Sequence, residues 1–114
     1  MTDAPFAPRP HDLGDTVALV PIAPEAVDDL ARRTVAIDPW ARLGVAAAAM
    51  ATRIAAPSDG ARRFAVTRAG AIVGWVSVRH PFMRGPYLET IALFPEAQRG
   101  GIARRVIDWM GREV

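Results

Sequence analysis

The chain contains 114 residues, of which 14 are basic and 12 acidic, and its formal net charge is +2. All the basic residues are arginine, and the absence of cysteine excludes a disulfide framework and thiolate chemistry. Hydrophobic residues make up 51% of the chain, too many for a disordered protein, and the length fits one domain. No apolar run reaches the roughly 18 residues of a membrane helix and no secretory signal opens the chain. We therefore expect a soluble cytoplasmic protein.

The first half of the chain predicts a tail, one strand and two helices. Residues 1–15 carry several prolines and no periodic pattern, which predicts a flexible N-terminal tail. The β-branched apolar run at 16–22 predicts a strand. A helix is expected over 24–38, because its first turns hold a proline and acidic residues that suit a helix N-terminus. The alanine-rich run at 43–56 predicts a second helix.

The second half predicts a hairpin, a strand and a final helix. Residues 62–80 alternate in the manner of paired strands, with the turn at Ala69–Gly70. Gly74, inside the returning strand, indicates a bulge or the close approach of another backbone. Residues 87–94 predict a third strand of this sheet, and a helix follows from Gly101. Its apolar face is expected to consist of Ile102, Val106, Ile107 and Met110.

Residues 95–101, PEAQRGG, join this strand to the last helix, and we call them the glycine loop. Gly100 and Gly101 permit a sharp turn and leave the backbone open to a ligand. The unpaired N–H groups at the start of a helix attract anions, and Arg99 and Arg104 would add charge. The chain supplies a matching asymmetry, with a net charge of −2 over residues 1–57 and +4 over residues 58–114. The sequence therefore predicts a phosphate site, although an ordinary turn with a solvated arginine-rich surface remains the alternative.

Known phosphate motifs discriminate among the possible ligands. The chain has no lysine for a P-loop and no G-x-G-x-x-G fingerprint for a dinucleotide. It does contain Q/R-x-x-G-x-G/A, as Gln98-x-x-Gly101-x-Ala103, after an apolar strand that ends at Pro95. This segment resembles the acetyl-CoA loop of the GNAT superfamily of N-acetyltransferases. FAVTRAGAIVGWVSV also resembles the central hairpin of that family, so the resemblance extends over residues 16–114.

The resemblance implies an α/β (α+β) domain over residues 16–114, with a mixed, mostly antiparallel sheet and helices on both faces. Members of the family usually continue beyond the loop helix, so 16–114 would be the N-terminal part of such a domain. The implied function is direct transfer of the acetyl group of acetyl-CoA to a primary amine of a small molecule or peptide. The alternative is a non-catalytic fragment that binds CoA or a partner chain. Scattered arginines without a recognition motif argue against a nucleic-acid partner.

The resemblance also assigns candidate site residues. The CoA pyrophosphate would bind the loop and the pantetheine arm would lie along the preceding strand. The cofactor-binding candidates are Ile91, Ala92, Leu93, Gln98, Arg99, Gly100, Gly101, Ile102, Ala103 and Arg104. Glu89 and Tyr87 are the catalytic candidates, as base and proton donor, although each also suits an ordinary strand position. We expect no metal site. An exposed edge at 87–94 would favour a homodimer or an exchanged strand.

Overall fold

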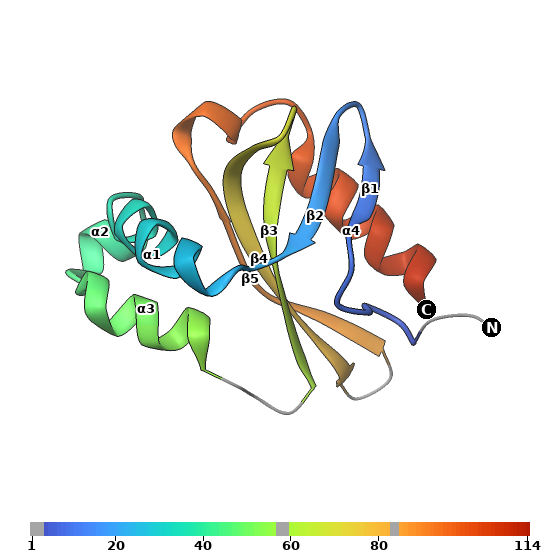
Figure 1. Ribbon diagram of the computed structural model, residues 1–114, viewed down its shortest axis with the longest axis horizontal. Coiled ribbons are helices and arrows are strands. Elements are labelled where there is room, and N and C mark those ends of the chain that lie inside the picture. The colour runs from blue at the N-terminus through green and yellow to red at the C-terminus, as the bar shows by residue number, and fades with distance from the viewer. Residues whose placement is uncertain (1–3, 57–59, 83–84) are drawn as a thin grey trace.

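A five-stranded sheet forms the centre of the fold in the computed structural model, which describes residues 4–56, 60–82 and 85–114 (Figure 1). Every strand is antiparallel to the next one in the chain, in the order β1-β2-β3-β4-β5. Within the described residues, the outer edge of β5 therefore has no partner strand. The strands are β1 (His11–Gly14), β2 (Val17–Pro21), β3 (Ala61–Arg68), β4 (Ala71–Phe82) and β5 (Gly85–Leu93).

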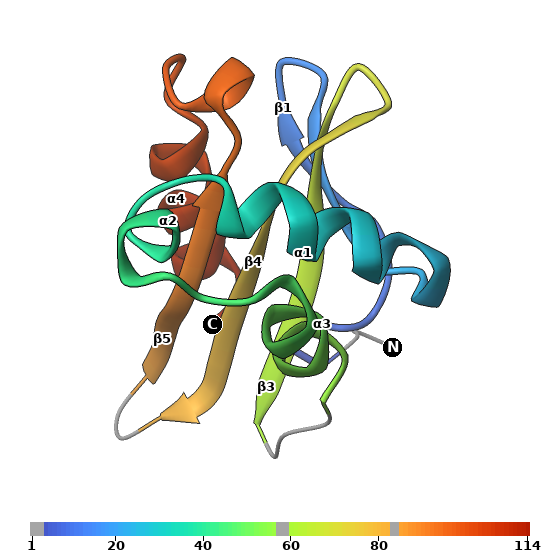
Figure 2. The ribbon, with the colours of Figure 1, turned by 90° about the vertical axis from the view of Figure 1, so that its left-hand side faces the viewer.

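Helices cover both faces of the sheet (Figure 2). One face carries the helices from the first half of the chain, and the other carries the C-terminal helix. The first layer contains η1 (Pro24–Ala26), α1 (Val27–Val35), α2 (Trp40–Leu43) and α3 (Ala47–Ala55), and the second contains α4 (Ile102–Glu113). The expected α+β class with helices on both faces is thus confirmed, but the expected mixed sheet is wrong for the described residues, whose strand pairs are all antiparallel. No helix in the described part of the chain is long and apolar enough to cross a membrane.

The predicted helix over 43–56 is wrong at its start, because Leu43 ends α2, residues 44–46 are not helical and α3 begins at Ala47. Gly44 adopts a left-handed conformation with φ of 70°, and its N–H group bonds back to carbonyl groups of α2. A left-handed residue of this kind ends a helix. Alanine propensity alone did not reveal this break.

Two hydrophobic clusters pack on the two faces of the sheet. Under α4, the cluster draws on the segment before β1, on the strands and on the helix itself. This cluster contains Phe6, Leu13, Val17, Leu19, Phe64, Val66, Val73, Val76, Val78, Ala97, Ile102, Val106, Trp109 and Met110. Under α1 and α3, the cluster contains Leu30, Ala31, Met50, Ile54, Trp75, Ala92 and Phe94. Because both sides of the central strands are buried, β3 and β4 hold runs of consecutive buried residues instead of a strict alternation.

The prediction of a flexible tail over residues 1–15 is wrong for residues 4–15. Phe6 is fully buried, and residues 11–14 form the edge strand β1. The Phe6 N–H group donates a hydrogen bond to Glu113 Oε1 at 3.0 Å, next to the C-terminal end of α4. The Phe6 and His11 rings pack edge-on against Trp109, with centroids 5.0 and 5.2 Å away. The segment is ordered by contacts with distant residues, which local periodicity does not report.

The expected apolar face of α4 is also wrong at one position. Ile107 is 54% exposed, whereas Trp109 is buried. At 100° per residue, Ile107 lies about 140° around the helix from Ile102, while Trp109 lies about 20° from it. The buried face of α4 therefore follows i, i+4, i+7 and i+8 from Ile102.

Gly74 confirms the prediction of a close backbone approach. The pairing of β3 with β4 shifts by one residue next to it, so that Val73 is the extra residue of a bulge. A Cβ atom on Gly74 would lie 2.3 Å from Ala92 O on β5. Glycine is therefore the residue that lets β4 and β5 pair at this point. The turn predicted at Ala69–Gly70 is confirmed too, and both residues have positive φ angles.

Candidate functional site

The glycine loop leaves free space beside its two glycines, which lie at the N-terminus of α4. It begins with the 3₁₀ turn η2 (Pro95–Ala97) and ends at Gly101, the N-cap residue of α4. Gly100 and Gly101 have φ angles of 111° and 79°, a region that favours glycine. A Cβ atom built on either residue would meet no other atom within 4 Å. The positive φ angles explain the need for glycine, and the empty space leaves the backbone accessible.

The N-terminus of α4 has the unpaired donors that an anion requires. No side chain caps it, and the first helical bond runs from the Arg105 N–H group to Gly101 O at 3.1 Å. The backbone N–H groups that precede Arg105 consequently have no intrahelical acceptor. With 12 residues, α4 also directs the positive end of its dipole toward the loop. This end of the helix is suited to a phosphate group.

Three arginines near the loop differ in whether their side chains are already engaged by other residues. Arg99 is exposed and has no hydrogen bond or ion pair with any described residue. Arg104 pairs with Asp108 at 3.3 Å, but its side chain is 80% exposed and remains adjustable. Arg105 is directed away, because it donates to Leu13 O at 3.0 Å and to Asp15 Oδ2 at 2.9 Å. Arg99 and Arg104 are therefore available to an anion, whereas Arg105 holds α4 to the β1–β2 turn.

The side chains of several predicted cofactor-binding residues do not face the space beside the glycines. The Gln98 side chain folds back and donates from Nε2 to Leu93 O at 3.1 Å. This bond joins the loop to the end of β5, although Gln98 is exposed. The Ile102 side chain is buried under α4, so only its backbone faces the loop. Ala103 is exposed beside them. The site is thus mainly a backbone site.

The free edge of β5 offers a second set of backbone groups. The Phe94 N–H group donates to Val73 O at 2.9 Å, so Phe94 is directed toward β4. Because successive residues of an antiparallel strand alternate in direction, the polar backbone groups of Leu93 and Ile91 are directed to the free edge. Those of Ala92 are directed toward β4. Of the predicted residues 91–93, the first and last can therefore pair with an extended ligand.

Glu89, a catalytic candidate, occupies a bulge of β5 and is engaged by neighbouring side chains. It is the extra residue between two pairs in the β4–β5 register. Ser77 Oγ donates to Glu89 Oε1 at 3.0 Å, and Arg79 Nη2 donates to Oε2 at 2.6 Å. The hydrogen bond from Arg79 lowers the pKa of Glu89 from its usual 4.5, and the bond from Ser77 and nearby charge act in the same direction. A carboxylate stabilised in this way is a weaker base.

Tyr87, the other candidate, is paired with Arg79 across the β4–β5 ladder, so it lies on the same face of the sheet as Glu89. It is 48% exposed, which agrees with the alternative of a half-buried strand aromatic. This face is the one covered further along by α1 and α3. The structure therefore brings both candidates together on one face, beside an arginine and a serine that the sequence patterns did not single out.

The pKa of Glu89 predicts a measurable dependence of stability on pH. A carboxylate whose pKa falls on folding stabilises the protein above its unfolded value of 4.5, and this contribution is lost as the pH falls through the folded value. We expect Glu89→Gln to lower the free energy of unfolding at about pH 7 by less than about 1 kcal/mol, because both partners are 30% exposed. Urea titrations of both proteins should converge as the pH falls below 4.5. A difference that stays constant would contradict the assignment.

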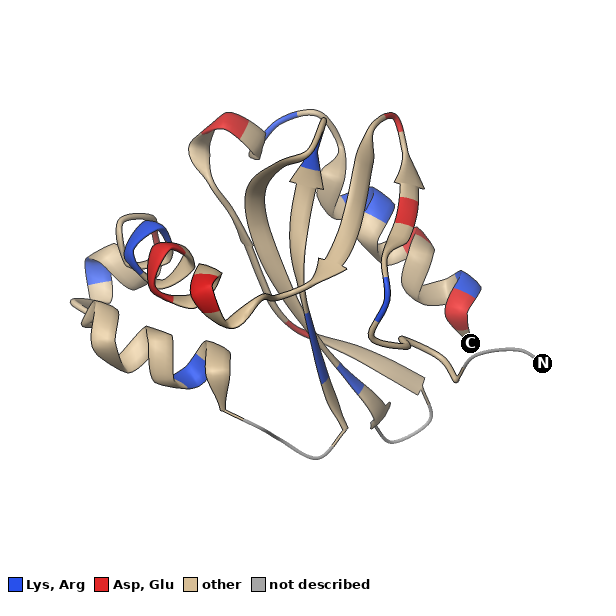
Figure 3. Ribbon diagram, viewed as in Figure 1, with Lys and Arg blue, Asp and Glu red and all other residues tan. Residues whose placement is uncertain are grey.

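Two arginines from distant elements also contact the glycine loop. Arg33 on α1 pairs with the Glu96 carboxylate, and Arg68 on β3 donates to Glu96 O at 2.7 Å. Arg33 and Glu96 are 63 residues apart, so no spacing in the sequence could reveal the contact. Elsewhere, positive charge is distributed over both helical layers and the sheet (Figure 3). Among the described residues, no group of three histidine, aspartate or glutamate side chains could hold a metal ion.

Comparisons with family models, with curated proteins and with solved structures give no match for this chain.

Proposed function

We propose that this chain binds acetyl-CoA at the glycine loop and is a GNAT-type N-acetyltransferase domain acting on a primary amine. The observation that carries the proposal is the pair of positive-φ glycines at the uncapped N-terminus of α4, directly after an edge strand. The motif Gln98-x-x-Gly101-x-Ala103 coincides with this junction. Phosphate affinity alone would fit many ligands. The motif, the preceding free strand edge and the hairpin before it favour CoA.

The residues present fit the diphosphate of such a ligand. The space beside Gly100 and Gly101 is empty, and the adjacent N–H groups lack acceptors. Arg99 and Arg104 would supply charge-assisted hydrogen bonds to phosphate oxygens. The outward backbone groups of Ile91 and Leu93 would pair with the amides of the pantetheine arm in the manner of an added strand. One of these groups, Leu93 O, already accepts a bond from Gln98, so that bond would have to share or exchange its acceptor.

When bound, acetyl-CoA would supply the activated acyl group, and the chain would contribute position and electrostatics. Holding an amine close to a thioester accounts for much of the rate in transfers of this kind. Tyr87 and Glu89 border the same side of β5 and are the groups that could orient an acceptor or move a proton. Glu89 is held as a carboxylate by Arg79, which suits binding an ammonium group better than removing its proton. A base acting through water is compatible with this arrangement.

The ion pair of Glu89 specifically favours a second candidate, a GNAT-like module that binds CoA or a partner chain without catalysis. A base with a lowered pKa and occupied lone pairs contributes little to deprotonation. The phosphate site does not depend on Glu89, since Glu89 lies in the middle of β5 and the glycine loop begins at Pro95, beyond the end of the strand. The two candidates share the CoA site and differ only in the chemistry next to it.

Calorimetric titration with CoA and with acetyl-CoA tests the proposal. We expect both to bind with a dissociation constant below about 100 μM, and to bind more weakly at high salt because charged contacts contribute. Release of free CoA that requires an added amine would then distinguish the transferase from the non-catalytic module. Failure of both ligands to bind at high micromolar concentration would contradict both candidates. Salt-sensitive binding to DNA of comparable strength would point instead to a nucleic-acid partner.

A further inference from the structure

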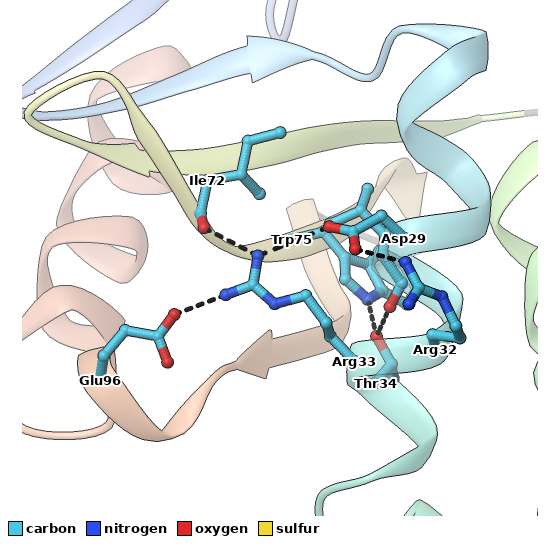
Figure 4. Close-up of polar contacts among 8 residues, drawn as sticks. Asp29, Arg32, Arg33, Thr34, Ile72, Trp75 and Glu96 are labelled. Carbon is cyan, nitrogen blue, oxygen red and sulfur yellow. Dashed lines mark hydrogen bonds and ion pairs between the residues drawn. The ribbon is translucent and has the colours of Figure 1, made fainter.

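Arg33 on α1 makes four contacts, and the one with Glu96 reaches the glycine loop. Figure 4 shows its contacts with Ile72, Glu96 and Asp29. Its Nη1 atom donates to Ile72 O at 3.1 Å, and its Nη2 atom pairs with the Glu96 carboxylate. The guanidinium group lies 4.1 Å from the centroid of the Phe94 ring, the residue that precedes the loop. Asp29, one turn earlier on α1, lies 3.7 Å from Nη1 and helps to orient the group. Arg33 thus spans the place where β4 extends beyond the end of β5.

The helix that carries Arg33 is itself fixed to the sheet. Thr34, the next residue, is fully buried, and its hydroxyl accepts a hydrogen bond at 2.9 Å from Trp75 Nε1 on β4. The same hydroxyl donates to Leu30 O at 2.6 Å within α1. Trp75 is 1% exposed, so this contact lies inside the core. A buried, fully paired contact is costly to break, and α1 therefore offers a stable platform.

The turn that Arg33 contacts comes shortly before the two glycines of the loop. Glu96 lies in η2, four residues before Gly100. Its carboxylate is held by Arg33 and its carbonyl by Arg68, and the neighbouring Ala97 is 1% exposed. Both ends of this single residue are consequently tied to elements outside the loop. The glycines themselves have no side chains that could fix their direction.

We propose that Arg33 is a positioning residue that sets the geometry of the glycine loop from α1. Without it, η2 would keep only its contact with Arg68 and the buried Ala97, and the loop would sample orientations in which its N–H groups no longer converge. The functional part of this inference rests on the proposed binding of CoA. By linkage, a ligand that binds the loop would in turn stabilise its attachment to α1, a helix on the opposite side of the sheet from α4.

Hydrogen exchange of the ligand-free protein tests the positioning directly. We expect the amides of Phe94 and Ala97, which donate to Val73 O at 2.9 Å and to Phe94 O at 2.8 Å, to exchange about threefold to fivefold faster in Arg33→Gln and in Glu96→Gln, the effect of losing a partly exposed pair. The double variant should exchange no faster than Arg33→Gln alone, since the two changes remove one interaction. Arg32→Gln is the matched control, because among the described residues the Arg32 side chain pairs with Asp29 alone, on the exposed side of α1. Equal exchange in all variants would overturn the proposal.

A CoA titration of the same variants tests the functional consequence. Arg33→Gln and Glu96→Gln should bind CoA about threefold to fivefold more weakly than the unchanged protein, while Arg32→Gln binds equally well. Restored affinity in the reversed pair, Arg33→Glu with Glu96→Arg, would support a specific link. If the unchanged protein binds CoA but the variants match it, the role of Arg33 is contradicted. If no variant binds CoA, the proposed function fails, and the exchange experiment still decides whether Arg33 positions the loop.

Discussion

Replacing Trp109 by alanine should lower the free energy of unfolding by about 3–5 kcal/mol, the range for truncating a buried large aromatic residue. Trp109 is 2% exposed, and its ring contacts those of Phe6, His11 and Phe64 at centroid distances of 5.0 to 5.6 Å. These contacts join the N-terminal segment, β3 and α4. The cavity would therefore loosen three elements together. Urea denaturation followed by circular dichroism measures the loss.

Two variants sharpen this expectation. Ile107→Ala, on the same helix, should change the free energy of unfolding by no more than about 0.5 kcal/mol, because Ile107 is 54% exposed. Trp109→Phe should lose about 1 kcal/mol, since it keeps a ring and removes an indole N–H group that has no hydrogen-bond partner in the described structure. Equal losses of unfolding free energy for Trp109→Ala and Ile107→Ala would contradict the assignment of Trp109 to the buried face of α4 and of Ile107 to its exposed face.

The parts of the fold that the sequence predicted are those with a local cause. The hairpin turn requires positive φ angles, which Ala69–Gly70 supplies, and Gly74 indicates the close approach of β5. The errors have non-local causes. Phe6 is ordered by α4, more than 90 residues later, and nothing around it in sequence indicates this. Gly44 ends α2 and delays the start of α3 to Ala47, in an alanine-rich run whose helix propensity predicted one helix from residue 43.

In the candidate site, too, features with a local cause could be predicted from the sequence and features with a non-local cause could not. Its backbone part was predicted, because Gly100 and Gly101 at a strand-to-helix junction have a direct physical meaning. Its side-chain environment was not. The engagement of Glu89 by Ser77 and Arg79 depends on a bulge and on strand register, which a single sequence does not define. The role of Arg33 depends on the packing of a helix across the sheet. The assignment to the GNAT family and to acetyl-CoA remains a prediction that binding experiments must test.

Replacing Gly101 by glutamate should weaken CoA binding by more than about 100-fold, because two effects add at the proposed phosphate site. A φ angle of 79° is strained for any residue with a Cβ atom, so the N-terminus of α4 would shift. The carboxylate would also place negative charge among the N–H groups that should receive phosphate. Calorimetry with CoA measures the loss, and Gly101→Ala separates strain from charge by retaining only the first.

Gly44→Glu provides the matched control for this prediction. Gly44 also has a positive φ angle, 70°, and a Cβ atom there would likewise meet nothing within 4 Å. The same substitution therefore introduces similar strain and the same charge at the end of α2, outside the proposed site. Both variants should lose about 1 kcal/mol of stability, but only Gly101→Glu should lose affinity. If both bind CoA as tightly as the unchanged protein, the glycine loop is not the binding site, whatever ligand the chain recognises. If both lose affinity equally, the effect is general destabilisation, and the loop again has no special role.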